Sequence, residues 1–514
     1  MQTPLRHLRI CLGALVLLAA PLVATATAMA DTTDDGVPRI GLDPGEPQVP
    51  SPTPAVPFGV QPALSREYVL DFHGYLLLPA QLGLHERPNT PTMPLPAGQS
   101  SLVLHAPPLV PMDPHDFAYT GVVPNPWLQL NFIYGNSTVS ATVILAGTSA
   151  IDAAGYYDPV AQMGVNDAFL TVNLSKKFGF PFQLNVGAYT GRYGAMGMYD
   201  AGRYGTPLIA QTNTIGEEVT LAYKVGEVLL LVDQGLGGQL GRPPVGLVPA
   251  GWNDFADPNV GATFVNQLHL GIAYRPLFRL GLHYLTAFTQ DDLTPAGNIP
   301  NGRITVMGAD VHVTGGRAGH LYLGVAKTWA TNAQSVSGAI EVLNARGGPD
   351  LRAHYLGADA QGNVNGSLTT FGGQYDLSLA RLVFGQIYTG VSPDILVSLF
   401  GVGTYVTSVN ASYNDVLKLK GGFEASYLFL SWLGISERFD HVRLHGSDST
   451  QAYTSLASRL LFHTGWRSRG EIALQYTYFL YGSGVYIESG YPPVVDMSIN
   501  PDRNVFSLIG TFWW

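Results

Sequence analysis

The 514-residue sequence contains a single cysteine, Cys11, and only 12% of its residues are charged. One cysteine cannot form a disulfide within the chain, and it cannot build a metal site from several thiolates. Soluble globular proteins carry about twice this fraction of charged residues. These two shortages exclude a disulfide-stabilised scaffold and make an ordinary soluble domain a poor match to the composition.

Long apolar runs and basic clusters are scarce as well. Beyond residue 30, no stretch approaches the ~20 consecutive apolar residues of a transmembrane helix, although 46% of the sequence is hydrophobic. The formal net charge is -10, and no basic cluster is present to neutralise phosphates, so a nucleic acid is excluded as a partner. A chain that is apolar throughout, but nowhere continuously, fits strands that turn one face to lipid.

The first 65 residues have two distinct compositions. In residues 1–30, Arg6 and Arg9 precede a short apolar run, and this segment ends on a small-residue cleavage pattern. The pattern predicts a signal peptide, with Cys11 in the removed part. A retained membrane anchor is the alternative. Residues 31–65 are rich in proline, as in PGEPQVPSPTPAVP, and predict a disordered periplasmic leader. A contact of this leader with peptidoglycan or a partner protein is the other possibility.

From residue 66 onward, polar and apolar residues alternate with a period of two, which is typical of strands with two different faces. Short turns join the strands in pairs, and long connections separate the pairs. We identify eighteen segments, at 68–76, 127–134, 137–145, 167–174, 182–189, 217–223, 227–233, 267–274, 278–285, 304–313, 320–327, 369–377, 382–390, 418–429, 433–444, 455–462, 471–480 and 503–514.

The alternation of short turns and long loops predicts an all-β fold, a transmembrane antiparallel up-and-down β-barrel over 66–514. An even number of about eighteen strands places both ends of the barrel on the periplasmic side. Residues 395–411 lie in a connection that we expect at 391–416, but they could form a further strand or hairpin, so sixteen or twenty strands remain open. A soluble β-sandwich is the alternative fold, but it gives no reason for one set of connections to stay short.

Polar side chains fall on one face of these strands, opposite leucine, phenylalanine and tyrosine. A charged side chain without a partner in hydrocarbon costs several kcal/mol, so the polar face is expected to line the lumen. A barrel of this size is wide enough for an aqueous channel. The predicted lumen-facing residues carry both signs of charge and are Asp71, His73, Glu218, Arg279, Lys418, Lys420, Glu424, Arg459 and Glu471.

The sequence from Arg503 to Trp514, RNVFSLIGTFWW, alternates in the same way and stops on an aromatic residue. It resembles the closing strand of a Gram-negative outer-membrane β-barrel, in which the final aromatic residues belong to the assembly signal. The residues that match are Phe512, Trp513 and Trp514. This resemblance implies location in the cell outer membrane, with membrane lipids and the barrel-assembly machinery as partners.

Together, the signal peptide, the period-two segments, the turn and loop lengths and this terminus resemble a bacterial outer-membrane porin. The resemblance implies passive diffusion of small hydrophilic solutes, often through homotrimers, without a cofactor. It also implies that the third long loop, 191–213, folds into the pore. The candidates for the constriction in this loop are Arg192, Tyr199, Asp200, Arg203 and Tyr204.

We do not expect an enzyme. The sequence has no Walker loop, HExxH or GxSxG motif, and its glycine-rich stretch 235–241 lacks the dinucleotide-binding spacing. The histidines are scattered singly, without a metal-ligand spacing. Two other functions stay open: a hydrolase embedded in the barrel, which would need a histidine beside a nucleophile such as Ser458, and a structural or adhesive barrel with a filled lumen.

We predict that deleting Trp513 and Trp514 impairs assembly, because the closing strand loses its terminal aromatic residues and its pairing with the first strand near Tyr68. The measurement is the amount of heat-modifiable barrel in the outer membrane. Normal amounts of inserted barrel from the shortened gene would contradict the assignment of the assembly signal.

Overall fold

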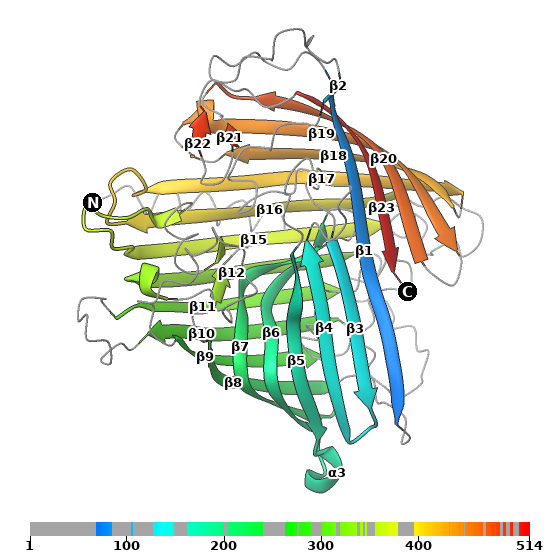
Figure 1. Ribbon diagram of the computed structural model, residues 1–514, viewed down its shortest axis with the longest axis vertical. Helices are drawn as coiled ribbons and strands as arrows, with labels where there is room; N and C mark the ends of the chain where they lie inside the picture. The colour runs from blue at the N-terminus through cyan, green and yellow to red at the C-terminus, as the bar shows by residue number, and fades with distance from the viewer. Residues whose placement is uncertain are drawn as a thin grey trace.

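The computed structural model describes residues 68–84, 104–105, 127–148, 162–199, 204–239, 263–274, 277–289, 301–314, 319–336, 340–342, 345–346, 355–378, 395–430, 432–443, 445–446, 448–465, 469–483, 487–489, 494–496 and 503–513. The predicted signal peptide and leader lie outside these residues. The described part is almost entirely strand (Figure 1).

Eighteen of the described strands form the wall. They are β1 (Val69–Leu84), β3 (Trp127–Gly135), β4 (Val139–Thr148), β5 (Gln162–Asn173), β6 (Phe182–Tyr199), β7 (Tyr204–Val225), β8 (Val228–Gln239), β9 (Thr263–Tyr274), β10 (Phe278–Thr289), β11 (Arg303–Thr314), β12 (His320–Thr331), β15 (Gly366–Ser378), β16 (Ile395–Ser408), β17 (Val416–Leu430), β18 (Leu433–Arg443), β19 (Ala452–Gly465), β20 (Arg469–Tyr481) and β23 (Asn504–Trp513).

Each wall strand pairs in antiparallel fashion with the next one along the chain. The last strand, β23, also pairs with the first, with Trp513 opposite Tyr75 and Val505 opposite Gly83. The sheet therefore closes on itself, and the predicted up-and-down barrel is confirmed. The contact between its ends begins at Tyr75 rather than near Tyr68.

The predicted hairpin between 369–377 and 382–390 is wrong, because β15 pairs with a later strand. Residues 382–390 lie outside the described ones, and the partner of β15 is β16, which falls in the connection expected at 391–416, where a further strand was the alternative. In β16 the side chains of Phe400, Thr404 and Val406 are buried on the inner face. The β15–β16 connection, 379–394, is therefore longer than expected, and the β16–β17 connection, 409–415, is shorter.

Most of the turns at the other predicted seams are short because local hydrogen bonds fix them. The side chain of Asn136 accepts from the backbone N–H groups of Thr138 and Val139, which closes the β3–β4 turn. Gly226 supplies the positive φ of 61° that the β7–β8 turn requires. Between β5 and β6 the chain forms one helical turn, α3 (Ser175–Phe178), where we expected a plain turn.

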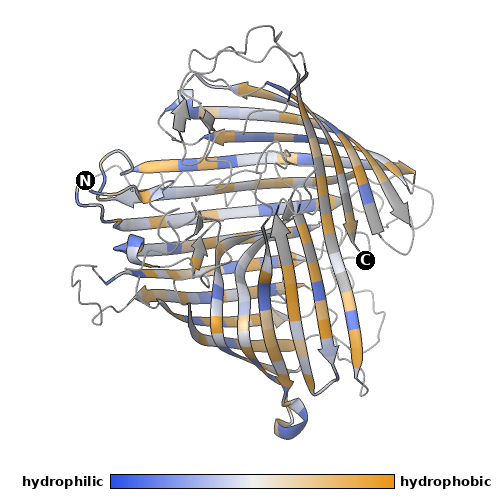
Figure 2. Cartoon of the chain, in the orientation of Figure 1, coloured by the Kyte–Doolittle hydropathy of each residue, from blue (hydrophilic) through white to orange (hydrophobic). Residues whose placement is uncertain are grey.

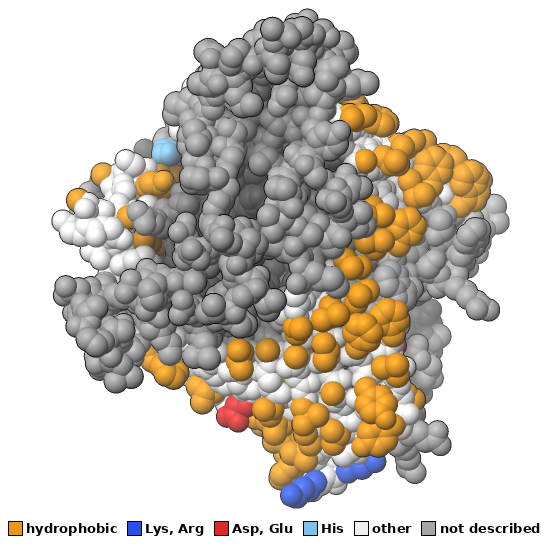
Figure 3. Space-filling view, viewed as in Figure 1, with side chains coloured by type: hydrophobic (Ala, Val, Ile, Leu, Met, Phe, Trp, Pro, Cys, Tyr) orange, Lys and Arg blue, Asp and Glu red, His pale blue; other side chains and the backbone are white. Residues whose placement is uncertain are grey.

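The two faces of the wall differ as the period-two pattern predicted. On β23, Ser507 and Ile509 are fully buried, whereas Phe506 and Leu508 are 38% and 45% exposed. Hydropathy alternates along the strands in Figure 2, and apolar side chains cover much of the outer wall seen in Figure 3. No helix within the described residues has the length and apolar character needed to span a bilayer. An apolar outer face, with most of the charged and amide side chains on the inner face, confirms the predicted outer-membrane barrel.

The segment predicted as the third long loop is mostly strand. β6 and β7 continue as one hairpin, and they contact β11, β12 and β15, which lie several strands away around the ring. Ile209 of this hairpin is fully buried, and a β-carbon at Gly308 on β11 would come within 2.8 Å of its Cδ1 atom. The end of the hairpin therefore folds into the barrel and packs on the inner face of β11, β12 and β15.

Two segments from the β12–β15 connection join this hairpin inside the barrel. The short strand β13 (Ile340–Val342) pairs with β7, with Ile340 opposite Thr212, and also with β14 (Ala345–Arg346). Residues 355–364 contribute buried apolar side chains to one cluster with the hairpin and the inner wall. The interior thus holds an apolar core built from the chain's own connections, which the sequence had not indicated.

Leu474 lies near the middle of β20 on the outer face. We predict that Leu474→Arg lowers the free energy of unfolding by about 2–4 kcal/mol, because it places a cation in hydrocarbon. The control is Leu474→Met, which keeps the volume and the apolar character. Denaturant titration of the barrel in lipid vesicles measures both variants, and an unchanged midpoint for the arginine variant would contradict the lipid-facing assignment.

Candidate functional site

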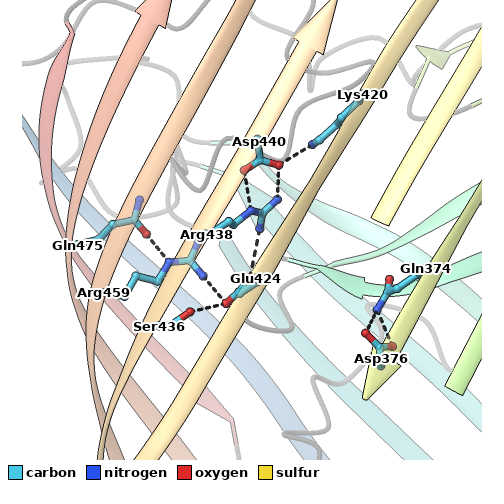
Figure 4. A network of polar contacts seen from close by, with 9 residues as sticks. All are labelled: Gln374, Asp376, Lys420, Glu424, Ser436, Arg438, Asp440, Arg459 and Gln475. Atoms are coloured by element: carbon cyan, nitrogen blue, oxygen red, sulfur yellow. Dashed lines mark hydrogen bonds and ion pairs between the residues drawn. The ribbon is translucent and has the colours of Figure 1, made fainter. Parts of the chain in front are cut away.

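A network of charged side chains lies on the inner face of β17 to β20. Arg438 donates from Nε and Nη2 to the two carboxylate oxygens of Asp440, at 2.7 and 3.1 Å. The Glu424 carboxylate lies 3.7 Å from Nη1 of Arg438 and accepts from Nη1 of Arg459 at 3.0 Å. Lys420 Nζ lies 3.8 Å from Asp440. Figure 4 shows that these side chains converge from adjacent strands on the same region of the wall.

Neutral groups complete the network. Ser436 Oγ donates to Glu424 at 2.8 Å, and Arg459 Nε donates to the amide oxygen of Gln475 at 2.7 Å. The side chains of Arg438 and Arg459 are fully buried, while that of Glu424 is 15% exposed. Buried charges persist only when they are paired and hydrogen-bonded. The network therefore fixes the positions of four neighbouring strands and leaves Glu424 as its most accessible charge.

Aromatic rings cover the cations of this wall. Lys418 Nζ lies 4.9 Å from the centre of the Tyr355 ring, and the Arg438 guanidinium lies 5.2 Å from that of Phe400. Tyr355 belongs to the connection between β12 and β15, so the inward-folded segment touches the charged wall directly. Such cation–π contacts contribute about 0.5–2 kcal/mol each.

The segment 355–365 is fixed at the long-loop end of β16 and β17. Asn410 Nδ2 donates to the backbone oxygen of Ala358 at 2.6 Å, and Gly357, with φ of 60°, packs under Tyr413. Within the segment, the backbone N–H groups of Asn363 and Gln361 donate to Asp359. These bonds, from Asn363 first, hold the pKa of the Asp359 carboxyl below its ordinary value. The segment is thus a defined turn rather than an open loop.

A second polar group lies on the part of the wall formed by β6 to β11. Glu218 accepts from the amides of Asn185 and Gln267, at 2.9 and 3.2 Å. The oxygen of the Gln267 amide accepts from Thr212 at 2.6 Å, and Thr212 belongs to the inward hairpin. Gln267 therefore connects Glu218 on the wall to Thr212 of the hairpin through hydrogen bonds.

Two histidines lie beside this group and under the hairpin. The rings of His269 and His283 are stacked at 4.5 Å, and the Tyr193 ring meets them edge-on at 5.9 and 5.6 Å. Asp233 lies 3.9 Å from His269, and Asp310 is hydrogen-bonded to His283. Tyr193 of the hairpin thus rests on a row of four polar residues from β8 to β11.

The structure places the predicted lumen-facing residues as follows. Glu218, Arg279, Lys418, Lys420, Glu424, Arg459 and Glu471 are on the inner face. Asp71 has the inward parity but is exposed near the start of β1, and the side chain of His73 lies outside the described ones. Glu218, Lys420, Glu424 and Arg459 belong to the two polar groups. Lys420 and Arg459 lie beside carboxylates instead of facing open water.

The predicted constriction and terminal residues are only partly described. Asp200, Arg203 and Trp514 lie outside the described residues, and only the backbone is described for Arg192, Tyr199, Tyr204 and Trp513. Phe512 pairs with Leu76 of β1 and Gly470 of β20. Sequence reasoning missed Arg438, Asp440 and Asp310. The first two share the parity of Ser436 in 433–444, so the alternation alone could have identified them.

Two kinds of chemistry can be tested against the geometry. No group of three or more His, Cys, Asp and Glu residues in the described part of the chain could hold a metal ion. Ser458 lies on the outer face, and its Oγ donates to Glu437 at 2.8 Å. A serine hydrolase needs a base beside the nucleophile. The partner described for the Ser458 hydroxyl is thus the carboxylate of Glu437, on the outer face of the barrel, and not a histidine.

We predict that Arg438→Met lowers the free energy of unfolding by about 3–5 kcal/mol, because it leaves the buried Asp440 without its two guanidinium hydrogen bonds. The control is Arg443→Met, the same substitution at the outward-facing end of β18, with an expected change within about 0.5 kcal/mol. Equal unfolding midpoints for the two variants would show that the network does not stabilise the barrel.

No protein-family model matches the sequence, and no curated protein sequence matches it. Solved structures do resemble the fold at low identity. The outer membrane channel DcaP of Acinetobacter baumannii is 12% identical, with 88% of this chain and 100% of that chain covered, at a TM-score of 0.37. OmpT, an outer membrane protein of Vibrio cholerae, is 10% identical, with 87% and 98% covered, at 0.36.

Wzi of Escherichia coli, an outer membrane protein involved in capsule assembly and described as a carbohydrate-binding β-barrel, is 10% identical over 86% of this chain and 84% of that chain, at a TM-score of 0.38. At these scores no residue role or ligand transfers to this chain. Its class rests on its own closed ring, apolar outer face and polar inner face, which are those of an outer-membrane β-barrel.

Proposed function

We propose that the protein is an outer-membrane channel for small hydrophilic solutes, with a path narrowed by its own inward-folded segments. The observation that supports this function is the placement of charged and amide side chains on the inner face of a ring whose outer face is apolar. A polar lining is costly unless it meets water, solutes or polar partners. Strands with a polar inner face and an apolar outer face are the arrangement of water-filled barrels.

The hairpin of β6 and β7 is the proposed constriction. It folds inward over the neighbouring part of the wall, where Tyr193 packs on His269 of β9 and His283 of β10. Hydrogen bonds of Thr212 to Gln267 and strand pairing with β13 hold it there. Solutes would pass between this hairpin and the charged wall of β17 to β20, where Glu424 is the accessible carboxylate.

The charges of the lining support a channel without strong preference for anions. On one side, cations and carboxylates of β17 to β20 are paired with one another. On the other, the partners of Glu218, Asp233 and Asp310 are amides, a threonine and the two histidines. A selective anion pore needs a succession of unpaired basic groups along the path. In the described part of the wall, the cations of the network are paired with carboxylates instead.

A passive channel needs no catalytic group, and we propose that the protein is not an enzyme. The competing function is a closed structural or adhesive barrel, which the apolar core inside the wall would suit. The two proposals differ in one measurable property, because only the channel conducts ions. The homotrimer implied by the porin resemblance stays a prediction.

We predict that the refolded barrel conducts in planar bilayers and that Tyr193→Ala raises its single-channel conductance, because the hairpin loses its aromatic contact with the histidine pair. Replacing residues 195–208 by a Gly-Ser-Gly linker should raise it further. The control is Tyr134→Ala, which removes the same ring from the outer face, where it is 57% exposed.

The outcomes separate the two ideas. If neither the parent nor any variant conducts while all are folded, the channel proposal is wrong and the closed barrel is favoured. If the parent conducts but the hairpin variants conduct equally well, the protein is a channel whose constriction lies elsewhere.

A further inference from the structure

The outer face of the barrel carries few charges, and their signs are separated along the barrel. On the described strands, the outward-facing basic residues are Arg303, Lys327 and Arg443, and all lie in the half nearer the long loops. The outward-facing acidic residues, Glu217 and Glu437, lie nearer the middle of their strands. Arg303 and Lys327 are on adjacent strands, β11 and β12, and form the cationic patch considered below.

The parity of both residues is settled by their neighbours. Met307 shares the parity of Arg303 on β11 and is 47% exposed, and Trp329 shares the parity of Lys327 on β12 and is 43% exposed. Ile304 and Thr328, which have the other parity, are buried. Arg303 is itself exposed, and its guanidinium lies 5.6 Å from the centre of the Phe288 ring, an outward-facing residue of β10. Both cations therefore point away from the lumen and toward the membrane.

Lys327 does not lie at the end of its strand, because three residues separate it from Thr331 at the long-loop end. Its Nζ donates to Thr369 Oγ1 on β15 at 3.0 Å. An ammonium has three donors, so one hydroxyl leaves capacity for a further acceptor. A lysine in the lipid-facing wall is destabilising toward the midplane and much less so near the interface. An anionic lipid group reached by the flexible side chain would offset that cost.

Trp329 indicates the depth in the membrane at which the anionic lipid group lies. Tryptophan is enriched where the hydrocarbon meets the headgroups, and Trp329 is two residues from Lys327 on the same face. Long loops mark the outer side of an outer-membrane barrel, so this interface belongs to the outer leaflet. Hydroxyl groups of Thr305, Ser367 and Thr369 share the outward face here and can bond sugar or phosphate oxygens.

The spacing of the two cations fits a headgroup with two anionic ends. Lys327 pairs with Met307, four residues along β11 from Arg303, which is about 13 Å at about 3.3 Å per residue. A single phosphate cannot contact both side chains at their bases, but a disaccharide with a phosphate at each end can span them. Guanidinium and ammonium groups are the side chains that bind phosphate most strongly.

We propose that the outer face of β11 and β12 binds a bisphosphorylated glycolipid of the outer leaflet, the lipid A part of lipopolysaccharide, with one phosphate at Arg303 and the other at Lys327. The hydroxyls beside Lys327 contact the sugar, and Trp329 packs at the boundary between the headgroup and the acyl chains. This site is independent of the lumen and of the proposed transport.

The experiment uses the full mature barrel refolded in detergent. Native mass spectrometry measures retained lipid for the parent, for the double variant Arg303→Gln with Lys327→Gln, and for each single variant. The probes are lipid A with both phosphates, the same lipid A after dephosphorylation, and inorganic phosphate. The control is the double variant Lys176→Gln with Lys224→Gln, which removes two exposed cations near the short-turn end.

The parent and the control should bind bisphosphorylated lipid A, while the double variant should bind at least about tenfold more weakly, through the loss of two charge-assisted contacts. Each single variant should fall between them. Heat modifiability of every variant shows that it is folded, and the single variants keep the test available if the double variant does not refold.

Three results would overturn the proposal: no lipid binding by the parent, equal binding by the parent and the double variant, or equal binding of dephosphorylated lipid A. Displacement of the lipid by millimolar inorganic phosphate would also overturn it, because the ligand would then be free phosphate.

Discussion

The closure of the sheet between β1 and β23 is the constraint on which the rest of the structure depends. In hydrocarbon every backbone N–H and C=O must be paired inside the protein, because an unpaired group costs several kcal/mol. The seam from Tyr75 to Gly83 supplies those partners for both ends of the sheet. Once the ring is closed, each strand has one face toward lipid and one toward the interior.

That division explains the unusual composition. Few charged residues are needed, because the outer face must be apolar over most of its area, as Figure 3 shows for one side of the barrel. Most of the charges that remain lie on the inner face, as in the network of Arg438, Asp440 and Glu424, or toward the membrane surface, as at Arg303.

The interior is the least expected part of the molecule. A ring of eighteen strands leaves more space than wall side chains can fill. This chain fills part of that space with its own connections, since the β6–β7 hairpin and residues 355–364 form an apolar core with the inner wall. The polar groups lie beside this core, so function and packing share the same space, and substitutions in the hairpin are expected to affect both.

The sequence by itself determined the strand faces and most strand positions, because alternation is a local property that residues i and i+2 reveal. It therefore predicted the inward parity of Lys418, Lys420 and Glu424 and the outward parity of Phe506 and Leu508. Only the tertiary structure decided which of 382–390 and 395–408 is paired with β15, since both alternate. It also decided that Arg438 meets Glu424 and that Tyr193 meets His283. These contacts depend on strand register and on a hairpin folded into the barrel, which join residues far apart in the chain.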